Sequence, residues 1–527
     1  MIGRARTGMA VVFLSLAVYL RTLAPGLTWA HQGADGGDLA AAVASGGIPH
    51  PSGYPTYMLV ARLFAALPLR DVAFRLNLMS AVCAAATVGL LYLLILALTG
   101  RQMDGKPSRP GAGSGAWTAN SPPAVAVAAG AALLFAFSPV FWSQALITEV
   151  YTLNALFVAL LALLAVQQTK RWGVIGLTVG VGLGNHLSLA LVIPGLLALA
   201  AGDGRSGRGR SAAGRAGAGL ALGLAVYLYL PLRAMCDPFV NWANPQTLDG
   251  FLWLVTGAPY RAYVLSLPLA DLPARLSAWA ALLMQQFGLP GLALLLLGAW
   301  DMLTDSDLRP GGAILFTFLI YGAYALSYRT ADSYVYLIPA YLVATVWLAR
   351  GLQVVAQAAR SWVESHSQPS QLSPRALPLM ITILLFLLPL RQAQANWSAL
   401  DLSSDNTAQV YLESAARRTP PHALIITASD EHTFALWYQQ AIEGTDSRLV
   451  IDRDLTQFAW QRQQIRQRAP DLAATPDSAE PSEYVAALVA EAQRKREVFL
   501  ADDDADLLQR FVWQKQGDWW QLQTEGK

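Results

Sequence analysis

The sequence predicts a polytopic α-helical membrane protein that ends in a soluble α/β domain. Hydrophobic residues make up 54% of the 527 residues and charged residues only 14%, whereas roughly 25% of the residues in a typical soluble domain are charged. About eleven apolar runs approach the length that a helix needs to cross a bilayer. After Leu390 the apolar runs give way to a segment of mixed charge.

The first apolar run, residues 9–24, follows Arg4 and Arg6 and so resembles a signal peptide. It lacks an Ala-x-Ala cleavage site and many more runs follow it, so we expect a retained first helix with a cytoplasmic N-terminus. The expected spans have their centres near Leu16, Ala86, Leu133, Leu160, Val179, Ile193, Ala225, Leu292, Leu319, Tyr341 and Leu384. The fifth and sixth are short enough to form a re-entrant or tilted pair, which would change the count by about two.

Basic residues predict which loops face the cytoplasm, because cytoplasmic loops of membrane proteins carry an excess of Lys and Arg. The inner loops are then those with Arg101, Lys106 and Arg109; Lys170 and Arg171; Arg205, Arg208, Arg210 and Arg215; Arg309; and Arg350, Arg360 and Arg375. The outer loops hold the chemically distinctive segments, namely the loop with Asp35 and Asp38 and residues 142–154, 184–186, 233–275 and 328–336. All distinctive loops are therefore expected on the outer face.

The last part of the chain has the pattern of a small α/β domain. Short apolar runs at residues 423–428, 449–452 and 498–501 alternate with helical stretches such as 457–468 and 484–495. We therefore divide the chain into a transmembrane domain, residues 1–392, and a soluble α/β domain, residues 393–527. An odd number of spans places the second domain outside the cytoplasm, and an even number would place it inside.

The composition excludes several partners and sites. The net charge is only +2 and the positive residues lie in short loops, which argues against nucleic acid as a partner. Cys83 and Cys236 offer neither a disulfide framework nor a zinc site. The sequence has no Gly-rich phosphate loop, no His-Glu-x-x-His motif and no Gly-x-Ser-x-Gly elbow with a plausible triad. The inner loops hold little besides Arg, Gly and Ser, so they offer no site for a soluble nucleotide-sugar. If the protein uses a donor substrate, we expect that donor to come from the membrane.

Asp35 and Asp38 are the first candidates for chemistry. Their spacing of three residues would put both carboxylates on one face of a helix. That arrangement suits a general base with a helper, or a pair that holds a cation. The alternative is structural, because either residue would also serve as the N-cap of a short helix over residues 39–43.

Glu149 lies at the mouth of the fourth span, where a carboxylate is costly unless it is paired or faces a wet cavity. The alternative for Glu149 is a structural ion pair with a loop arginine. Asn185 and His186 interrupt two apolar runs after several glycines, including Gly180. They either bind a polar ligand at the depth of Glu149 or belong to a helix-packing seam with a hydrogen-bonded histidine.

Arg233 and Arg261 are outer arginines and run against the positive-inside trend. A guanidinium group matches phosphate in a bidentate fork, so a lipid-linked phosphate would explain both. The alternative is a snorkelling or salt-bridged arginine. Candidate carboxylate partners are Asp237, Asp249, Asp271 and Asp332.

In their order along the chain, these segments resemble the bacterial branch of the protein O-mannosyltransferase-like membrane family, which is usually assigned to the C-type glycosyltransferase superfamily. The motifs that carry the resemblance are Asp35-Gly-Gly-Asp38, His50-Pro-Ser-Gly-Tyr-Pro55, Asn77-Leu-Met-Ser80, Trp142-Ser-Gln144, Glu149-Val-Tyr-Thr-Leu-Asn154, Gly184-Asn-His186, Tyr229-Leu-Pro-Leu-Arg233 and Asn241-Trp-Ala-Asn-Pro245. The resemblance covers residues 10–345 and extends more loosely to residues 429–437.

The resemblance implies a polytopic enzyme that uses a polyprenyl-phosphate sugar, with a catalytic carboxylate in the first outer loop. The family's usual Asp-Ser-Gly-Glu appears here as Asp35-Gly-Gly-Asp38, and its His-Pro-Pro-Gly-Tyr-Pro as His50-Pro-Ser-Gly-Tyr-Pro55. The first acid is retained, whereas the second is shorter by one methylene group.

We therefore expect an inner-membrane glycosyltransferase that moves a sugar, such as mannose, from a polyprenyl-phosphate donor to a protein or glycan hydroxyl on the outer face. Asp35 is the expected base, Asp38 its helper, and the two arginines bind the phosphate. The other expected site residues are His50, Tyr54, Glu149, Tyr151, Asn185, His186 and Asp332. This mechanism removes the need for a strong metal site, and the spacing of Asp35 and Asp38, which would allow Mg²⁺ or Mn²⁺, leaves metal dependence open. The alternative function is a transporter or flippase for a lipid-linked glycan, which should carry polar residues near mid-membrane in paired, broken helices.

Overall fold

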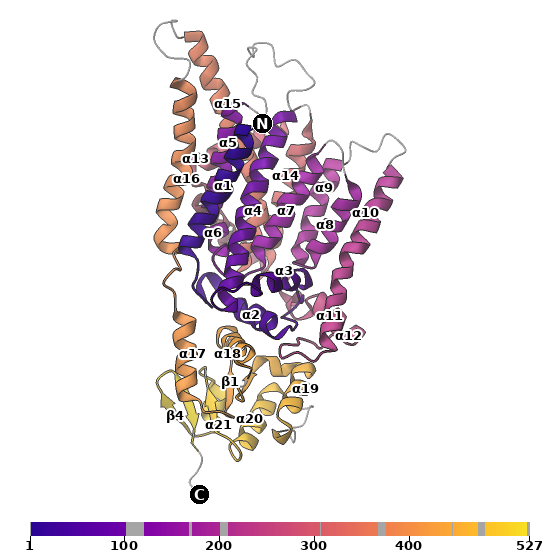
Figure 1. Ribbon diagram of the computed structural model, residues 1–527, viewed down its shortest axis with the longest axis vertical. Coiled ribbons are helices and arrows are strands. Elements are labelled where there is room, and N and C mark those ends of the chain that lie inside the picture. The colour runs from indigo at the N-terminus through magenta and orange to yellow at the C-terminus, as the bar shows by residue number, and fades with distance from the viewer. Residues whose placement is uncertain are drawn as a thin grey trace.

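A helical bundle with an α/β domain at one end makes up the molecule (Figure 1). The computed structural model describes residues 2–101, 121–167, 171–200, 209–305, 307–366, 376–444, 446–472 and 480–523. The N-terminus lies at the end of the bundle opposite the α/β domain. Of the basic residues expected in the inner loops, Lys106, Arg109, Lys170, Arg205, Arg208 and Arg375 lie outside the described residues.

The helices of the bundle coincide with the expected apolar runs. They are α1 (Ile2–Thr22), α4 (Val72–Arg101), α5 (Pro122–Ala136), α7 (Tyr151–Val166), α8 (Trp172–Leu183), α9 (Ile193–Ala200), α10 (Gly209–Leu224), α13 (Leu272–Leu303), α14 (Leu308–Ser327), α15 (Ile338–His366) and α16 (Ala376–Leu400). Each expected centre falls in one of these helices except Ala225, which begins the 3-10 helix η3 (Ala225–Leu228) directly after α10.

Within the described part of the chain, five helical segments are long and apolar enough to cross a membrane. They are Val72–Leu98, Ser211–Ala234, Leu269–Leu303, Leu308–Ser327 and Ser333–Ala359. The chain is therefore a multi-pass membrane protein, and the number of spans stays a prediction.

The expected fifth and sixth spans are short, as predicted. Helix α8 has 12 residues, which is about 18 Å of helix and less than the roughly 30 Å of a bilayer core. It packs closely on α10, because a Cβ atom on Gly180 would lie 2.5 Å from the carbonyl oxygen of Leu220 and one on Gly219 would lie 2.1 Å from that of Gly173. These glycines therefore form a packing seam, the structural alternative considered for this segment.

Short elements connect the bundle at the end that faces the α/β domain (Figure 1). The helices there are α2 (Asp35–Ser45), α3 (Pro55–Ala65), α6 (Pro139–Gln144), α11 (Tyr229–Ala234) and α12 (Leu248–Val255). The 3-10 helices there are η1 (Ala30–Gln32), η2 (Leu187–Val192), η4 (Ala258–Tyr263), η5 (Leu269–Asp271) and η6 (Ser333–Leu337). All five distinctive segments expected on one face of the membrane thus contribute to the same end of the bundle.

The C-terminal region forms the expected α/β domain. Its elements are α17 (Thr407–Arg418), β1 (Leu424–Thr427), α18 (Asp430–Glu443), β2 (Leu449–Asp452), η7 (Asp454–Gln457), α19 (Ala459–Arg468), η8 (Pro470–Leu472), α20 (Pro481–Ala492), β3 (Val498–Leu500), α21 (Ala505–Arg510), β4 (Trp513–Gln516) and β5 (Trp519–Leu522). The strand order is β2-β1-β3-β5-β4, with β2, β1 and β3 parallel and β5 and β4 added antiparallel. The three predicted apolar runs are the parallel strands, and the β4–β5 hairpin was not predicted.

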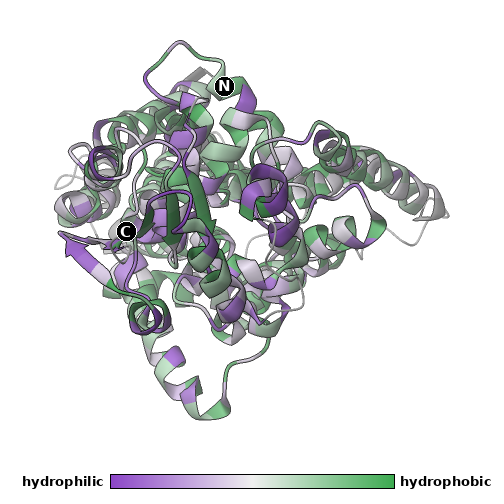
Figure 2. Ribbon diagram, turned by 90° about the horizontal axis from the view of Figure 1, so that it is seen from below, coloured by the Kyte–Doolittle hydropathy of each residue, from purple (hydrophilic) through white to green (hydrophobic). Residues whose placement is uncertain are grey.

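Alternate residues of the parallel strands face two cores, as the two-residue period of a strand requires. Ile425 and Phe499 pack with α18 and the membrane part of the chain, whereas Leu424 and Ile426 pack with α19 and α20. Figure 2, seen from the side of this domain, shows the hydrophobic strands among more polar helices. Burial on both faces explains why these strands read as continuous apolar runs.

Helix α16 runs past the end of its apolar stretch. The polar residues after Leu390 bind neighbouring helix ends, since Gln392 Nε2 donates to the carbonyl oxygen of Gln285 at 2.7 Å and Asn396 Nδ2 to that of Phe137 at 3.2 Å. The division drawn at residues 392 and 393 therefore falls inside α16. The composition changes there because the helix leaves the apolar environment, while its backbone continues to Leu400.

Candidate active site

A polar cavity lies between the end of the bundle and the α/β domain. It encloses about 1390 Å³ of empty space, part of it open to solvent. The lining comes from all the distinctive segments and from the C-terminal domain: Gln32, Ala34, Asp35, His50, Pro51, Ser52, Tyr54, Tyr151, His186, Leu187, Ser188, Thr256, Gly257, Tyr260, Arg261, Tyr263, Val264, Tyr324, Tyr328, Thr330, Asp332, Tyr336 and Asp430. Of the predicted site residues, this cavity brings together Asp35, His50, Tyr54, Tyr151, His186, Arg261 and Asp332.

His50 lies between the two acids of the first loop. Asp38 is fully buried, and its Oδ2 accepts hydrogen bonds from both the backbone N–H and the Nδ1 of His50, each at 2.8 Å. Its Oδ1 accepts a third from the indole Nε1 of Trp242 at 3.0 Å. On the other side of the ring, Nε2 lies 3.4 Å from Oδ2 of Asp35, whose side chain is 41% exposed. Asp38 therefore orients His50, and Asp35 presents its carboxylate to the cavity.

The local backbone makes this arrangement possible. The N-cap of α2 is Ala34, which makes no side-chain capping bond, so Asp35 and Asp38 lie in the first turn and neither is a cap. Their charges still favour the helix N-terminus electrostatically. The turn that carries His50 depends on Gly53, which has φ +79° and whose Cβ would lie 2.9 Å from Leu230.

Both carboxylates change the pKa of His50, Asp35 through its charge and Asp38 through a hydrogen bond. Burial alone would lower the pKa of His50, but the negative charge of Asp35 and the hydrogen bond to Asp38 outweigh it and raise this pKa to about 9. Burial raises the pKa of Asp35, against the effect of His50, and Asp332 adds to the rise. At neutral pH the site thus holds a cationic imidazole beside a carboxylate with increased proton affinity.

The expected metal pair does not form in this arrangement. Both oxygen atoms of Asp38 accept hydrogen bonds, and the ring of His50 separates Asp38 from Asp35. In the described parts of the chain, no group of three or more His, Cys, Asp or Glu side chains has the spacing to hold a metal ion. The donor set present therefore does not fit Mg²⁺ or Mn²⁺, which prefer several oxygen ligands.

Glu149 lies behind the cavity wall. It is 4% exposed, does not line the cavity, and its Oε2 accepts the backbone N–H of Val150 at 3.2 Å. Burial and the nearby charge of Asp35 raise the pKa of Glu149. Its position supports an electrostatic influence on Asp35 and His50 and gives it no direct contact with a molecule in the cavity.

Other motif residues hold the loops around the cavity. Asn77 Nδ2 donates to the carbonyl oxygens of Ala24 and Gly26, at 3.1 and 2.8 Å. The buried indole of Trp142 donates to Thr22 Oγ1 at 3.1 Å. Asn185, also fully buried, donates to the carbonyl oxygen of Val150 at 3.1 Å and does not line the cavity. The expectation that Asn185 contacts substrate is therefore not met, because its amide joins two loops instead.

An aromatic wall surrounds His186. Its ring centroid lies 6.2 Å from that of Tyr54, 5.6 Å from that of Tyr151 and 5.7 Å from that of Tyr336. His186 Nδ1 accepts a hydrogen bond from the backbone N–H of Ser188 at 3.1 Å, and the other ring nitrogen, Nε2, takes no part in this bond. Burial and the charge of His50 lower the pKa of His186 to about 4, so this ring is neutral at physiological pH.

Arg261 and Arg233 occupy different places. Arg261 lines the cavity and its Nη2 donates to Thr256 Oγ1, and in the described residues neither arginine forms an ion pair with a carboxylate. Arg233 Nε donates to the carbonyl oxygen of Gly46 at 2.6 Å, at the end of α2 opposite Asp35. The 11 residues of α2 span about 16 Å. The structure therefore places Arg261 in the cavity lining and Arg233 outside it, so it does not bring the two predicted phosphate ligands together in this cavity.

Asp430 is a cavity residue that the sequence motifs did not single out. It begins α18 of the C-terminal domain, and α18 packs directly on α2, where a Cβ atom on Gly37 would lie 2.8 Å from the backbone carbon of Phe434. Burial and the charge of Asp35 raise the pKa of Asp430 to about 7. The looser resemblance at residues 429–437 marked this segment, but only the packing of the two domains brings it to the cavity.

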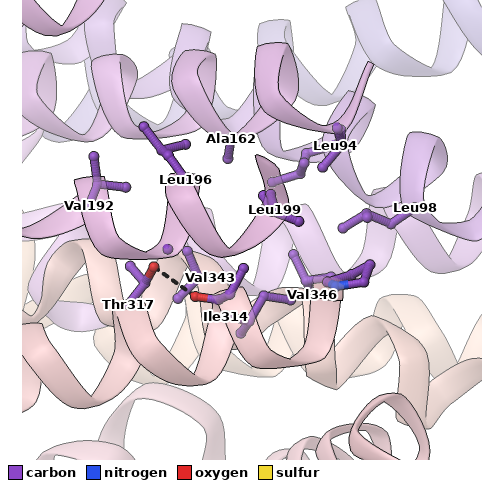
Figure 3. A pocket seen from close by; sticks show the side chains of 14 residues that line it. Leu94, Leu98, Ala162, Val192, Leu196, Leu199, Ile314, Thr317, Val343 and Val346 are labelled. Carbon is purple, nitrogen blue, oxygen red and sulfur yellow. Dashed lines mark hydrogen bonds between the residues drawn. The ribbon is translucent and has the colours of Figure 1, made fainter. Parts of the chain in front are cut away.

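A second, apolar cavity lies inside the bundle between α4, α7, α9, α14 and α15 (Figure 3). Leu94, Leu196, Ile314 and Val346 point into it, and Thr317 has the only polar side chain in its lining, with Oγ1 donating to the carbonyl oxygen of Ala313 at 2.9 Å. No titratable group lines it. Of these two cavities, the polar one is lined by titratable side chains.

Comparisons with known proteins agree with the fold and with the resemblance. Residues 35–203 match the family described as the N-terminal domain of protein O-mannosyl-transferase TMEM260, and residues 404–522 match TMEM260-associated domain 2. The mouse protein O-mannosyl-transferase TMEM260 is 28% identical over 265 residues, which cover 47% of this chain and 34% of the relative. The protein of the same name from Dictyostelium discoideum is 25% identical over 347 residues, 59% of this chain and 39% of the relative. The chain thus matches less than half the length of these relatives.

Among solved structures, ArnT from Cupriavidus metallidurans has the same fold. The crystal structure bound to undecaprenyl phosphate superposes with a TM-score of 0.58 at 11% identity and covers 98% of this chain and 97% of ArnT. The apo structure gives a TM-score of 0.53 at 11% identity and covers 97% and 95%. The predicted fold class and the predicted family resemblance are confirmed.

Proposed function

This chain is an O-mannosyltransferase-like protein with the C-type glycosyltransferase fold, and we propose that it transfers a sugar from a polyprenyl-phosphate donor to a hydroxyl group in the polar cavity. The observation that carries the proposal is the position of Asp35. Its carboxylate faces a cavity large enough for a sugar, next to a histidine that a second, buried acid holds in place.

In the proposed reaction, Asp35 accepts the proton of the acceptor hydroxyl as that oxygen attacks the anomeric carbon of the donor sugar. The bond between this carbon and the phosphate oxygen breaks, and polyprenyl phosphate leaves with the bonding electrons. A base works best when its pKa lies near the working pH, and burial moves the pKa of Asp35 in that direction. Arg261 and the cationic ring of His50 stabilise the negative charge that grows on the departing phosphate.

The other cavity residues bind the sugar and the acceptor in this proposal. Asp332 and Asp430 offer carboxylate oxygens to sugar hydroxyls, and the aromatic wall around His186 offers flat apolar surfaces. A polyprenyl-phosphate donor is supported by ArnT, a protein of the same fold that binds undecaprenyl phosphate. Mannose and a protein acceptor are supported by the names of the relatives.

We place the enzyme in the plasma (inner) membrane with the polar cavity on the extracytoplasmic face. Arg309, from a loop expected inside, lies in the first turn of α14, at the end opposite Tyr328 and the cavity. Arg350, also expected inside, lies within α15 and pairs with Asp301 near the end of α13. Cytoplasmic loops carry the excess of basic residues. The cavity and the C-terminal domain therefore face outward in this proposal.

The purified chain should form a glycoside and free polyprenyl phosphate when given polyprenyl-phosphate mannose and a panel of peptides or glycans. Polyprenyl-phosphate glucose serves as the comparison donor, and Asp35→Asn as the inactive control. If the chain in vesicles only moves the intact lipid across the bilayer, with no glycosidic bond broken, the transferase proposal is wrong and the flippase alternative holds.

A further inference from the structure

Outside the polar cavity, two arginines from different elements meet beside the C-terminus of α2. They are Arg62, on α3, and Arg233, on α11. A Cβ atom built on Gly46 would lie 2.8 Å from Nη2 of Arg62 and 2.5 Å from Nη2 of Arg233. The two guanidinium groups are therefore direct neighbours, and both approach the backbone closely because the residue with φ +64° is a glycine without a Cβ atom.

Neutral groups surround the two guanidinium groups. Arg233 Nε donates to the carbonyl oxygen of Gly46 at 2.6 Å. The hydroxyl of Tyr229, which interacts electrostatically with both arginines, donates to the carbonyl oxygen of Gly47 at 3.1 Å. Among the ion pairs of the described residues, neither arginine has a carboxylate partner.

Two adjacent cations without an acid repel each other, and the fold nevertheless fixes them side by side. An anion between them would remove the repulsion and use the remaining N–H donors. Phosphate fits this role, because its oxygens match the fork of a guanidinium group in a bidentate geometry.

The surroundings of the pair are apolar and uncovered. Leu59 and Leu63 flank Arg62 on α3 and are 46% and 72% exposed, and Leu228 and Leu232 precede Arg233 with 61% and 62% exposure. The elements α3 and η3 contact each other at the end of the bundle that faces the α/β domain (Figure 1), where the apolar segment Ser211–Ala234 ends. Exposed leucines beside arginines at that depth are typical of a surface that meets acyl chains and headgroups.

We propose that Arg62 and Arg233 form a binding site for the phosphate headgroup of a membrane lipid, separate from the cavity that holds Asp35. The guanidinium groups bind the phosphate, and the four leucines pack against the acyl chains. The site lies at the far end of α2 from Asp35, so its ligand does not take part in the reaction. The inference needs only a membrane-embedded chain and does not rest on the proposed transferase activity.

Native mass spectrometry of the delipidated, full-length chain in detergent tests the proposal. The probe is phosphatidylglycerol; diacylglycerol with the same acyl chains lacks the phosphate, and glycerol 3-phosphate lacks the acyl chains. We expect phosphatidylglycerol to bind at least tenfold more tightly than either of them. The double variant Arg62→Gln/Arg233→Gln should lose at least tenfold in phosphatidylglycerol affinity, because both charge-assisted contacts are gone.

Arg70→Gln is the matched control. It removes one arginine at the same end of the bundle, where the guanidinium group lies over the ring of Phe74 at 4.9 Å, and it should leave the affinity unchanged. If the Gln double variant does not fold, Arg62→Lys/Arg233→Lys keeps the charge but loses the fork and should still weaken binding. Unchanged lipid affinity in the folded variants would overturn the proposal. Equal binding of glycerol 3-phosphate would show an anion site without a lipid. Glycosyl transfer, measured on the same samples, reports on the proposed function separately.

Discussion

The ring of His50 joins Asp35 to Asp38: Nε2 lies 3.4 Å from a carboxylate oxygen of Asp35, and Nδ1 lies 2.8 Å from one of Asp38. The two acids are three residues apart in the sequence, but only Asp35 is exposed to the cavity, with 41% of its side chain accessible against 0% for Asp38. The two acids should therefore respond differently to the same substitution.

Asp35→Asn keeps the size of the side chain but cannot accept the acceptor's proton. We expect glycosyl transfer to fall by about 10² or more while the protein still folds, because Asp35 lines the cavity and Asn keeps its size. A purified-protein transfer assay and a thermal melt measure both effects. Full activity in Asp35→Asn would remove it as the base.

Asp38→Asn should reduce stability as well as rate. Asp38 accepts hydrogen bonds from three N–H groups, whereas Asn has a single acceptor oxygen and would turn an NH₂ group toward N–H donors. Leaving a buried donor unsatisfied costs about 1–3 kcal/mol, so the melting temperature should fall by several degrees. A variant as stable as the unchanged chain would show that Asp38 does not hold His50.

Stability should depend on the protonation of His50 at alkaline pH. Its pKa in the folded chain is raised to about 9, above the roughly 6.5 of an unfolded histidine. The stabilisation is therefore complete below about pH 6.5 and is lost as pH rises through about 9. The difference in melting temperature between the unchanged chain and His50→Gln should be largest near pH 6. This difference should shrink between pH 7 and pH 10. A constant difference over this range would contradict a charged His50.

Asp430 should show the opposite pH dependence. Its folded pKa of about 7 lies above the roughly 3.9 of an unfolded aspartate, so the ionised side chain destabilises the fold as pH rises from about 4 through 7. Asp430→Asn should become more stable relative to the unchanged chain between pH 5 and pH 8, and its KM for the sugar donor or acceptor should rise. Asp454→Asn, in the same domain but outside the cavity lining, is the control. Equal pH profiles for Asp430→Asn and the unchanged chain would exclude a protonated Asp430.

Arg261→Lys should weaken use of the donor, because lysine keeps the charge but loses the bidentate fork. We expect kcat/KM for the polyprenyl-phosphate donor to fall by about tenfold or more, the range of one charge-assisted contact. Arg329→Lys removes an arginine of a neighbouring loop that does not line the cavity and should behave like the unchanged chain. The same loss in both variants would point to overall charge instead of a specific contact.

Some of this architecture could be predicted from the sequence. Successive loops of a membrane protein alternate between the two faces of the membrane, so their order predicts which loops lie on the same side. The basic loops and the distinctive loops alternate along the chain, and Asp35, Tyr151, His186, Arg261 and Tyr336 do line one cavity. The parallel strands could be predicted because they are buried on both faces.

The relations inside the site could not be predicted in the same way. The contact of His50 with both acids depends on the turn at Gly53, and the arrival of Asp430 depends on the packing of α18 on α2. Arg233 belonged to a family motif, yet the turn from η3 into α11 directs it to Gly46. Spacing along the chain carries no information about these contacts between distant segments.

The close approach of Gly37 to Phe434 has a consequence for how the protein is made. Asp35 and its neighbours leave the ribosome well before α18, because α18 follows all the described helices of the bundle in the sequence. The wall that carries Asp430 closes only when this late segment docks on an early one. A nascent chain that has inserted the described bundle helices still lacks a complete cavity, so chemistry in the cavity must wait until α18 has been made and has docked on α2.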